Sequence, residues 1–176
     1  MNNKKIEWTT VINQSINLIY TAIFFLPLIL LWFKFYSTYL MIVFISIALC
    51  IFFLPAQFYS FFQLSNSRII YERFYIHKFQ RFAQQGKYAK LLIERLTGKD
   101  YVIFKRHNIS QLRNQFRTFE AYHWACLFLF SASIVYALIN HAYLLTVLIF
   151  VSNLCYNIIP ILIQQYNKVR LKNMGI

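Results

Sequence analysis

Acidic residues and glycine are scarce in this sequence. Only 5 Asp and Glu stand against 18 Lys and Arg, 3 of the 176 residues are glycine, and 13% are charged while 59% are hydrophobic. A soluble domain of this length needs a polar surface that such a composition cannot provide, which excludes an ordinary globular protein. The net charge of +13 requires an anionic neighbour, and composition alone leaves open lipid head groups, a phosphorylated substrate and nucleic acid.

The 3 cysteines do not have the spacing of a disulfide or metal framework. Cys50, Cys126 and Cys155 each lie in an apolar run, without a C-x-x-C pair. The sequence also lacks a glycine-rich phosphate loop and a nucleophile elbow. We therefore predict no disulfide, no metal site and no bound cofactor.

Long apolar runs, in contrast, are abundant and predict the fold. Residues 16–33 and 39–62 form two runs within the segment 1–62, and residues 121–139 and 143–163 repeat the pattern within the segment 121–176. At a rise of about 1.5 Å per residue, each run can cross most of a hydrocarbon core about 30 Å thick. We predict an all-α integral membrane protein in which four transmembrane helices form two hairpins, the second with its tip at Asn140 and His141.

The basic residues are distributed unevenly between these runs. Of the 18 Lys and Arg, only Lys34 lies between the first two runs, and the others lie in the two terminal tails and in the segment 63–120. Four spans place all of those others on one side of the bilayer, whereas three spans would divide them. The positive-inside rule then predicts a multi-pass protein of the cell membrane with both termini and the segment 63–120 in the cytoplasm.

The segment 63–120 is itself patterned. Apolar residues recur at helical spacing from Ile69 to Phe82, interleaved with Arg68, Arg73, Lys78 and Arg81, which predicts an amphipathic helix at the membrane interface. A second short helix is expected from Lys87 to Leu96. A third is expected to start near Asn108 or Ser110 and to continue into the third span.

Two ionisable residues stand where the third span begins. Glu120 and His123 are three residues apart and therefore share one helix face, as Arg117 and Glu120 also do. Ionisable groups within a span are costly and often mark a functional site, but at the interface an ion pair between Arg117 and Glu120 explains the same spacing. Because the chain turns near His141, Glu120 and His123 are expected at the depth of Ile159 and Leu162, close to several polar residues of the fourth span.

Two features of the fourth span have alternative interpretations. Asn153 and Asn157 lie on one helix face, where they either join helices by hydrogen bonds or contribute to a site. Pro160 is either a tolerated kink or the break that opens a pocket.

The same residues resemble a known family. Glu120-x-x-His123-Trp124 is followed by N-I-I-P-I-L-I-Q-Q-Y-N-K-V-R, which runs from Asn157 to Arg170. These stretches look like the glycosyl-4,4'-diaponeurosporenoate acyltransferase family, whose members complete the carotenoid staphyloxanthin. The similarity covers about the C-terminal half of the chain, with a looser one from Glu72 to Lys78.

The resemblance implies a membrane-bound O-acyltransferase with acyl-CoA as co-substrate. The acceptor would be a sugar hydroxyl of a glycosylated carotenoid or glycolipid. A sugar hydroxyl must lose its proton to react, so our hypothesis is that His123 is the general base and Glu120 the residue that orients it. We expect the amides of Asn157, Gln164, Gln165 and Asn167 to hold the sugar or the developing oxyanion, and Arg170 with the basic residues of the segment 63–120 to bind the phosphates of coenzyme A. Tyr166 and His77 are the other expected substrate-binding residues.

A noncatalytic membrane module that binds anionic lipid or scaffolds a biosynthetic complex is the competing hypothesis. It predicts that Glu120 and His123 can be replaced without loss of function. A transporter is disfavoured because the spans lack midplane charges, and nucleic-acid binding is disfavoured because lipid is the nearest anion to the basic residues. The expected partners are membrane lipid, acyl-CoA and the acceptor, while the sequence leaves the oligomeric state, the acyl chain length and the acceptor open.

Overall fold

A computed structural model describes residues 3–81, 87–97 and 109–173 of the chain, and these residues form helices and no strand. The prediction of an all-helical fold is therefore confirmed for the described part of the chain. The elements are α1 (Asn3–Lys34), α2 (Thr38–Phe52), α3 (Ala56–Phe61), α4 (Arg68–Arg73), α5 (Ile76–Phe79), α6 (Lys87–Thr97), α7 (Ile109–Ile139), α8 (Tyr143–Asn153), the π-helical turn η1 (Leu154–Ile158) and α9 (Ile159–Asn173).

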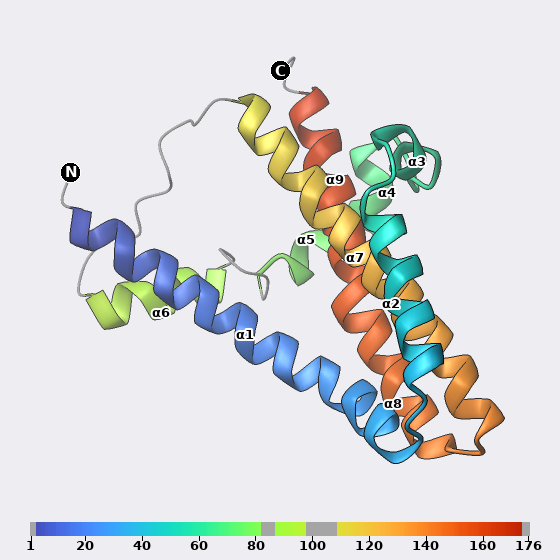
Figure 1. The fold of residues 1–176 in the computed structure, drawn as a ribbon. Coiled ribbons are helices and arrows are strands. Elements are labelled where there is room, and N and C mark those ends of the chain that lie inside the picture. The colour runs from blue at the N-terminus through green and yellow to red at the C-terminus, as the bar shows by residue number, and fades with distance from the viewer. Residues whose placement is uncertain (1–2, 82–86, 98–108, 174–176) are drawn as a thin grey trace.

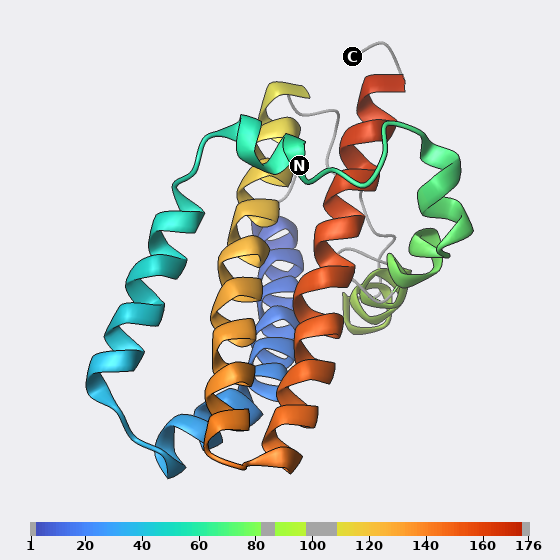
Figure 2. The same cartoon turned by 90° about the vertical axis from the view of Figure 1, so that its right-hand side faces the viewer.

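The centre of the fold is the antiparallel pair made by α7 and the continuous rod of α8, η1 and α9 (Figure 2). The chain reverses at residues 140–142, at the predicted tip. There His141 adopts a left-handed backbone with a φ of 54°, and the amide of Ala142 donates to the carbonyl of Ala137 at 2.9 Å. This bond satisfies one of the carbonyls left open at the end of α7.

Three helices are long and apolar enough to cross a membrane: Val11–Lys34, Leu112–Ile139 and Tyr143–Asn173. The helix α2 is also apolar, but its 15 residues extend only about 22 Å. The connection after α1 and the turn after α7 lie at the same end of the molecule (Figures 1 and 2). The structure thus establishes three membrane-spanning candidates, and a fourth span remains a prediction.

The predicted run 39–62 is not one helix. It is divided at Pro55 into α2 and α3, because proline lacks the N–H that would continue the helical bonds and its ring disfavours a helical residue before it. The hydroxyl of Tyr59 donates to the carbonyl of Ile51 at 2.5 Å and so holds α3 against the end of α2. The chain consequently turns away from the axis of α2 and crosses over the beginning of α7 (Figure 2).

The N-terminal pair also differs from a packed hairpin. The helices α1 and α2 meet near their connection, where the rings of Trp32 and Phe44 are 5.8 Å apart, and then diverge (Figure 1). Each finds a different partner in the central pair, α8 for α1 and α7 for α2. The apolar core is therefore made between α1 and the central pair; its fully or nearly fully buried members are Leu28, Leu31, Trp32, Phe130, Ala137 and Ile149.

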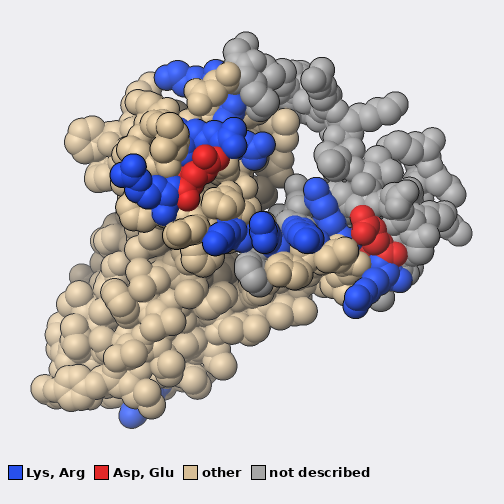
Figure 3. Space-filling model, turned by 180° about the vertical axis from the view of Figure 1, so that it is seen from behind, with Lys and Arg blue, Asp and Glu red and all other residues tan. Residues whose placement is uncertain are grey.

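The predicted amphipathic helix of residues 69–82 is also divided, with Phe82 outside the described residues. Tyr75 has a left-handed backbone with a φ of 57°, which separates α4 from α5. Both short helices pack on α9, where Tyr71 and Ile76 share a buried cluster with Ile163. The expected helix beginning at Lys87 is present as α6, which lies along α1 (Figure 1). Seen from behind, Lys and Arg form a band across this region of the molecule (Figure 3).

Candidate active site

Several polar side chains are buried where the first turns of α7 meet η1 and α9. Glu120 and Asn157 have no exposed surface, and Asn153 and Gln165 are exposed by 5% and 1%. Buried polar groups of this kind are costly unless they are paired, so each partner is informative.

The π-helical turn η1 lies directly before Pro160. In an α-helix the N–H of residue 160 would bond the carbonyl of Tyr156, and proline has no N–H to give. The chain instead makes a wider turn, in which the amide of Ile159 donates to the carbonyl of Leu154 five residues back. Pro160 therefore produces a π-helical turn within the rod, and it withdraws the usual α-helical partner from the carbonyl of Tyr156.

His123 faces this turn. Its half-buried imidazole has Asn157 and the backbone carbonyl of Tyr156 among its polar neighbours, and its ring centroid is 5.6 Å from that of Tyr156. The Nδ1 atom is buried and has no hydrogen-bond partner among the described residues. The Tyr156 hydroxyl is 2.8 Å from the Thr21 hydroxyl and 3.0 Å from that of Tyr122, which ties α1 and α7 to the same place.

Asn157, a polar neighbour of His123, also hydrogen-bonds within the central helix pair. Its amide donates to Oδ1 of Asn153 at 2.7 Å, and the amide of Asn153 donates to the hydroxyl of Ser131 at 3.1 Å. The two asparagines therefore do join α7 to the opposite rod, as one of the two interpretations expects. The Oδ1 atom of Asn157 is nevertheless buried without a partner among the described residues, so the same side chain retains an acceptor for a ligand.

Glu120 has a different partner from the one predicted. Its Oε2 atom accepts a hydrogen bond from Lys168 Nζ at 2.6 Å, and the two side chains are exposed by 1% and 21%. Neither the expected bond to His123 nor an ion pair with Arg117 is seen among the described residues. The reason is that Lys168 lies on the side of α9 that faces α7 beside Glu120, so its charged ammonium group reaches the carboxylate. The second carboxylate oxygen, Oε1, is buried without a hydrogen-bond partner in the part of the chain that the structure describes.

Three residues predicted to bind substrate are engaged within the protein. Gln165 accepts from the amide of Leu64 at 3.1 Å and donates to the carbonyl of Phe62 at 3.3 Å. Tyr166 donates to Glu72 Oε1 at 3.0 Å, and Asn167 Oδ1 accepts from the amide of Gln80 at 2.7 Å. These contacts fasten the segment from α3 to α5 onto α9, so their geometry favours a structural role.

The segment from α3 to α5, which we call the covering segment, contains two tyrosines that are affected by the charge of Glu120. Tyr59 and Tyr71 are both buried, and burial raises the pKa of each, with the charge of Glu120 adding to the effect. The pKa of Glu72, at the surface of α4, is held below its usual value by the hydrogen bond from Arg68 and then by that from Tyr166.

The remaining predicted residues lie around the same part of α9. Gln164 is half-buried, and its Oε1 atom is buried without a partner among the described residues. The Nδ1 atom of His77, on α5, is also buried without a hydrogen-bond partner among the described residues. Arg170 is exposed, with its guanidinium 5.6 Å from the centroid of the Tyr166 ring.

Two participants were not singled out from the sequence. Lys168 pairs with Glu120, and the indole Nε1 of Trp124 is a further buried atom without a hydrogen-bond partner among the described residues. Counting outward from the turn at His141 could have placed Lys168 near the start of α7. Nothing in the sequence indicates that the indole would lack a partner. Within the described ranges, no three His, Cys, Asp or Glu are grouped so that they could hold a metal ion.

Residues 55–175 match the model of the glycosyl-4,4'-diaponeurosporenoate acyltransferase family. The match includes α7, η1 and α9 and also the covering segment from α3 to α5, so it contains the polar contacts of this site except the one with Thr21 of α1. No curated protein and no solved structure matches the sequence.

Proposed function

Because the chain belongs to the glycosyl-4,4'-diaponeurosporenoate acyltransferase family, we propose that it is a membrane-bound O-acyltransferase that uses acyl-CoA. The acceptor in this proposal is a sugar hydroxyl of a glycosylated carotenoid or a related glycolipid. The description of the family supports an acyltransferase acting on a glycosylated carotenoid, and the three long apolar helices support a membrane location.

The observation that carries the proposal is the position of His123 beside the π-helical turn. One side of the imidazole faces the Tyr156 carbonyl, which lacks its usual α-helical donor because residue 160 is proline, while Nδ1 has no hydrogen-bond partner among the residues the structure describes. We assign the ring proton to Nε2, where it is donated to that carbonyl, so that Nδ1 keeps a free lone pair. An imidazole fixed in this tautomer can accept a proton from a hydroxyl at Nδ1.

The proposed reaction uses this lone pair. The sugar oxygen forms a bond to the carbonyl carbon of the thioester as His123 takes the hydroxyl proton. The carbon–sulfur bond then breaks, and the proton passes to the thiolate of coenzyme A. Positioned general bases contribute about 10²- to 10⁴-fold to such steps.

The unpartnered buried atoms supply contacts for the acceptor. Asn157 Oδ1 and Gln164 Oε1 can accept hydrogen bonds from sugar hydroxyls, and the indole N–H of Trp124 can donate one. A sugar is the ligand class that satisfies such a mixture, because every hydroxyl both donates and accepts. Glu120 acts in this proposal as a positioning residue: its ion pair with Lys168 fixes the relative placement of α7 and α9 instead of orienting His123 directly.

In this proposal, acyl-CoA, the acyl donor, binds at the cytoplasmic face. The basic residues of α4, α5 and α6 form the band seen in Figure 3, and Arg170 lies on the adjacent helix. Such a band attracts the phosphates of coenzyme A as well as anionic lipid head groups. We propose that both termini and this band lie on the cytoplasmic side of the cell membrane, with His77 at the border of the acceptor site.

The test is acyl transfer by membranes that contain the full chain, with radiolabelled acyl-CoA and a glycosylated carotenoid acceptor. His123→Gln is compared with His141→Gln, a control on the exposed turn, at equal protein levels. We expect the first variant to lose at least about 100-fold in rate and the second to match the wild type. Undiminished transfer by His123→Gln would remove the proposed base. Absence of transfer by the wild type would favour the noncatalytic module.

A further inference from the structure

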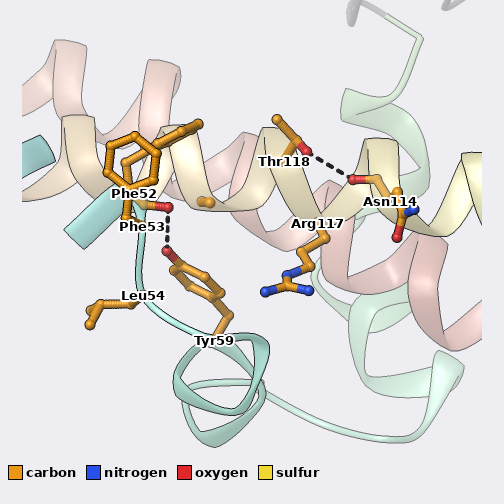
Figure 4. A pocket seen from close by; sticks show the side chains of 8 residues that line it. Phe52, Phe53, Leu54, Tyr59, Asn114, Arg117 and Thr118 are labelled. Atoms are coloured by element: carbon orange, nitrogen blue, oxygen red, sulfur yellow. Dashed lines mark hydrogen bonds between the residues drawn. The ribbon is translucent and has the colours of Figure 1, made fainter. Parts of the chain in front are cut away.

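A pocket lies on another side of α7, between its first turns and the end of α2 (Figure 4). Its volume is about 390 Å³, which is within the range of about 300–1,000 Å³ that is usual for small-ligand sites. The lining residues are Phe52, Phe53, Leu54, Tyr59, Asn114, Arg117, Thr118 and Ala121.

The pocket has one apolar and one polar wall. Phe52, Phe53 and Leu54 form the first, and Phe53 is 78% exposed, so the apolar wall continues onto the outer face of α2. On the polar wall, Arg117 extends from α7 toward the region of Tyr59 (Figure 4). Arg117 is exposed and has no ion pair among the described residues, and none of the lining residues is acidic.

This pocket is separate from the proposed active site. Successive residues of an α-helix are turned by about 100°, so the lining residue Ala121 and the site residue His123 point in directions about 200° apart. Glu120 lies between these two directions and already has Lys168 as its cation. The Arg117 guanidinium is therefore available to an anion from outside the chain.

The pocket also lies where apolar helical segments meet more polar residues. The apolar helix α2 ends at Phe52, and the candidate span of α7 starts at Leu112, so the pocket lies near the ends of two apolar elements. An amphiphile is the ligand class that matches an apolar wall and a cation at this level. We propose that the pocket binds one anionic phospholipid, with its phosphate on Arg117 and the first part of an acyl chain along Phe52 and Phe53.

A phosphate is expected to bind arginine more strongly than lysine at this position. The planar guanidinium offers two parallel N–H donors to a phosphate, while Asn114 on the same wall has an exposed amide. Lysine offers the charge without the paired geometry. The loss of one such contact is expected to weaken retention of the lipid about tenfold, or about 1.4 kcal/mol.

The test is native mass spectrometry of the purified full chain in detergent, with equal amounts of phosphatidylglycerol and phosphatidylcholine. The wild type is expected to retain one phosphatidylglycerol in preference to phosphatidylcholine. Arg117→Gln should lose that preference about tenfold, Arg117→Lys should lose less, and Asn114→Phe should exclude the lipid by filling the pocket. Arg113→Gln is the control. It removes the same charge one turn before Arg117 on α7, from a residue that does not line the pocket.

The result can overturn the proposal in three ways. Equal retention of the two lipids by the wild type would mean that the pocket does not select an anion. An equal loss in Arg113→Gln and Arg117→Gln would assign the preference to general charge. Displacement of the lipid by free coenzyme A, which has phosphates but no acyl chain, would assign the pocket to the acyl donor. Because the measurement uses no acceptor and no acyl transfer, its outcome is independent of the proposed activity.

Discussion

Replacing Lys168 with methionine is expected to destabilise the protein by about 3 kcal/mol. Breaking a buried ion pair by removing one partner typically costs about 3–5 kcal/mol, because the remaining charge is left in a poorly polarisable environment. Glu120 would be that charge, with 1% of its side chain exposed and its second oxygen already without a hydrogen-bond partner in the described ranges. We expect a loss near the lower limit of about 3 kcal/mol, because Lys168 is 21% exposed and water can enter when it is removed.

The measurement is the free energy of unfolding in detergent micelles, followed by circular dichroism during a denaturant titration. Lys168→Arg keeps a cation within reach of Glu120 and should lose the least. The double variant Lys168→Met with Glu120→Leu removes both charges and should recover most of the loss, since apolar replacement of a buried pair is often neutral. A Lys168→Met protein as stable as the wild type would show that the ion pair does not stabilise the fold. A double variant less stable than Lys168→Met alone would show that the unpaired charge of Glu120 is not the cause of the loss.

Three further predictions concern the surroundings of the site. Gln165→Ala should cost about 1–3 kcal/mol, because it leaves buried polar groups of the covering segment unpaired, and limited proteolysis should then cleave that segment before α4. The lowered pKa of Glu72 contributes stability that is present above the ordinary pKa of 4.5 and is lost as the pH falls through the lowered pKa. At pH values below 4.5 the denaturant concentration at the unfolding midpoint should therefore decrease, and Glu72→Gln should remove this pH dependence. Pro160→Ala restores an N–H for the Tyr156 carbonyl, which should convert the π-helical turn toward an α-helix and lower acyl transfer at least about tenfold.

The central helix pair could be predicted from the sequence for a clear physical reason. Its apolar runs are long, and they are separated by two polar residues at which the chain must reverse. The position of the turn then fixes which residues of α7 and α9 lie at one depth, and this brought His123 and Asn157 together correctly. Family membership was also recognisable, because the residues that carry it lie in these same two helices.

The partners of the polar residues could not be predicted in the same way. Gln165, Tyr166 and Asn167 are consecutive, but each is turned by about 100° from the last, so each meets a different part of the covering segment. The left-handed backbone at Tyr75, which divides the amphipathic stretch, has no glycine or proline to signal it. Pro55 did give a signal, but an apolar run interrupted by proline is compatible with either a kinked span or two helices.

The acylated product is the most direct test of the central claim that this chain transfers an acyl group through His123. Lipid extracts of membranes supplied with acyl-CoA and a glycosylated carotenoid are analysed by mass spectrometry, with the wild type beside His123→Gln. We expect, with the wild type alone, a product that is labile to mild base and heavier than the acceptor by one fatty acid less one water. Extracts that contain only the unacylated glycoside in the presence of folded wild-type protein would contradict it.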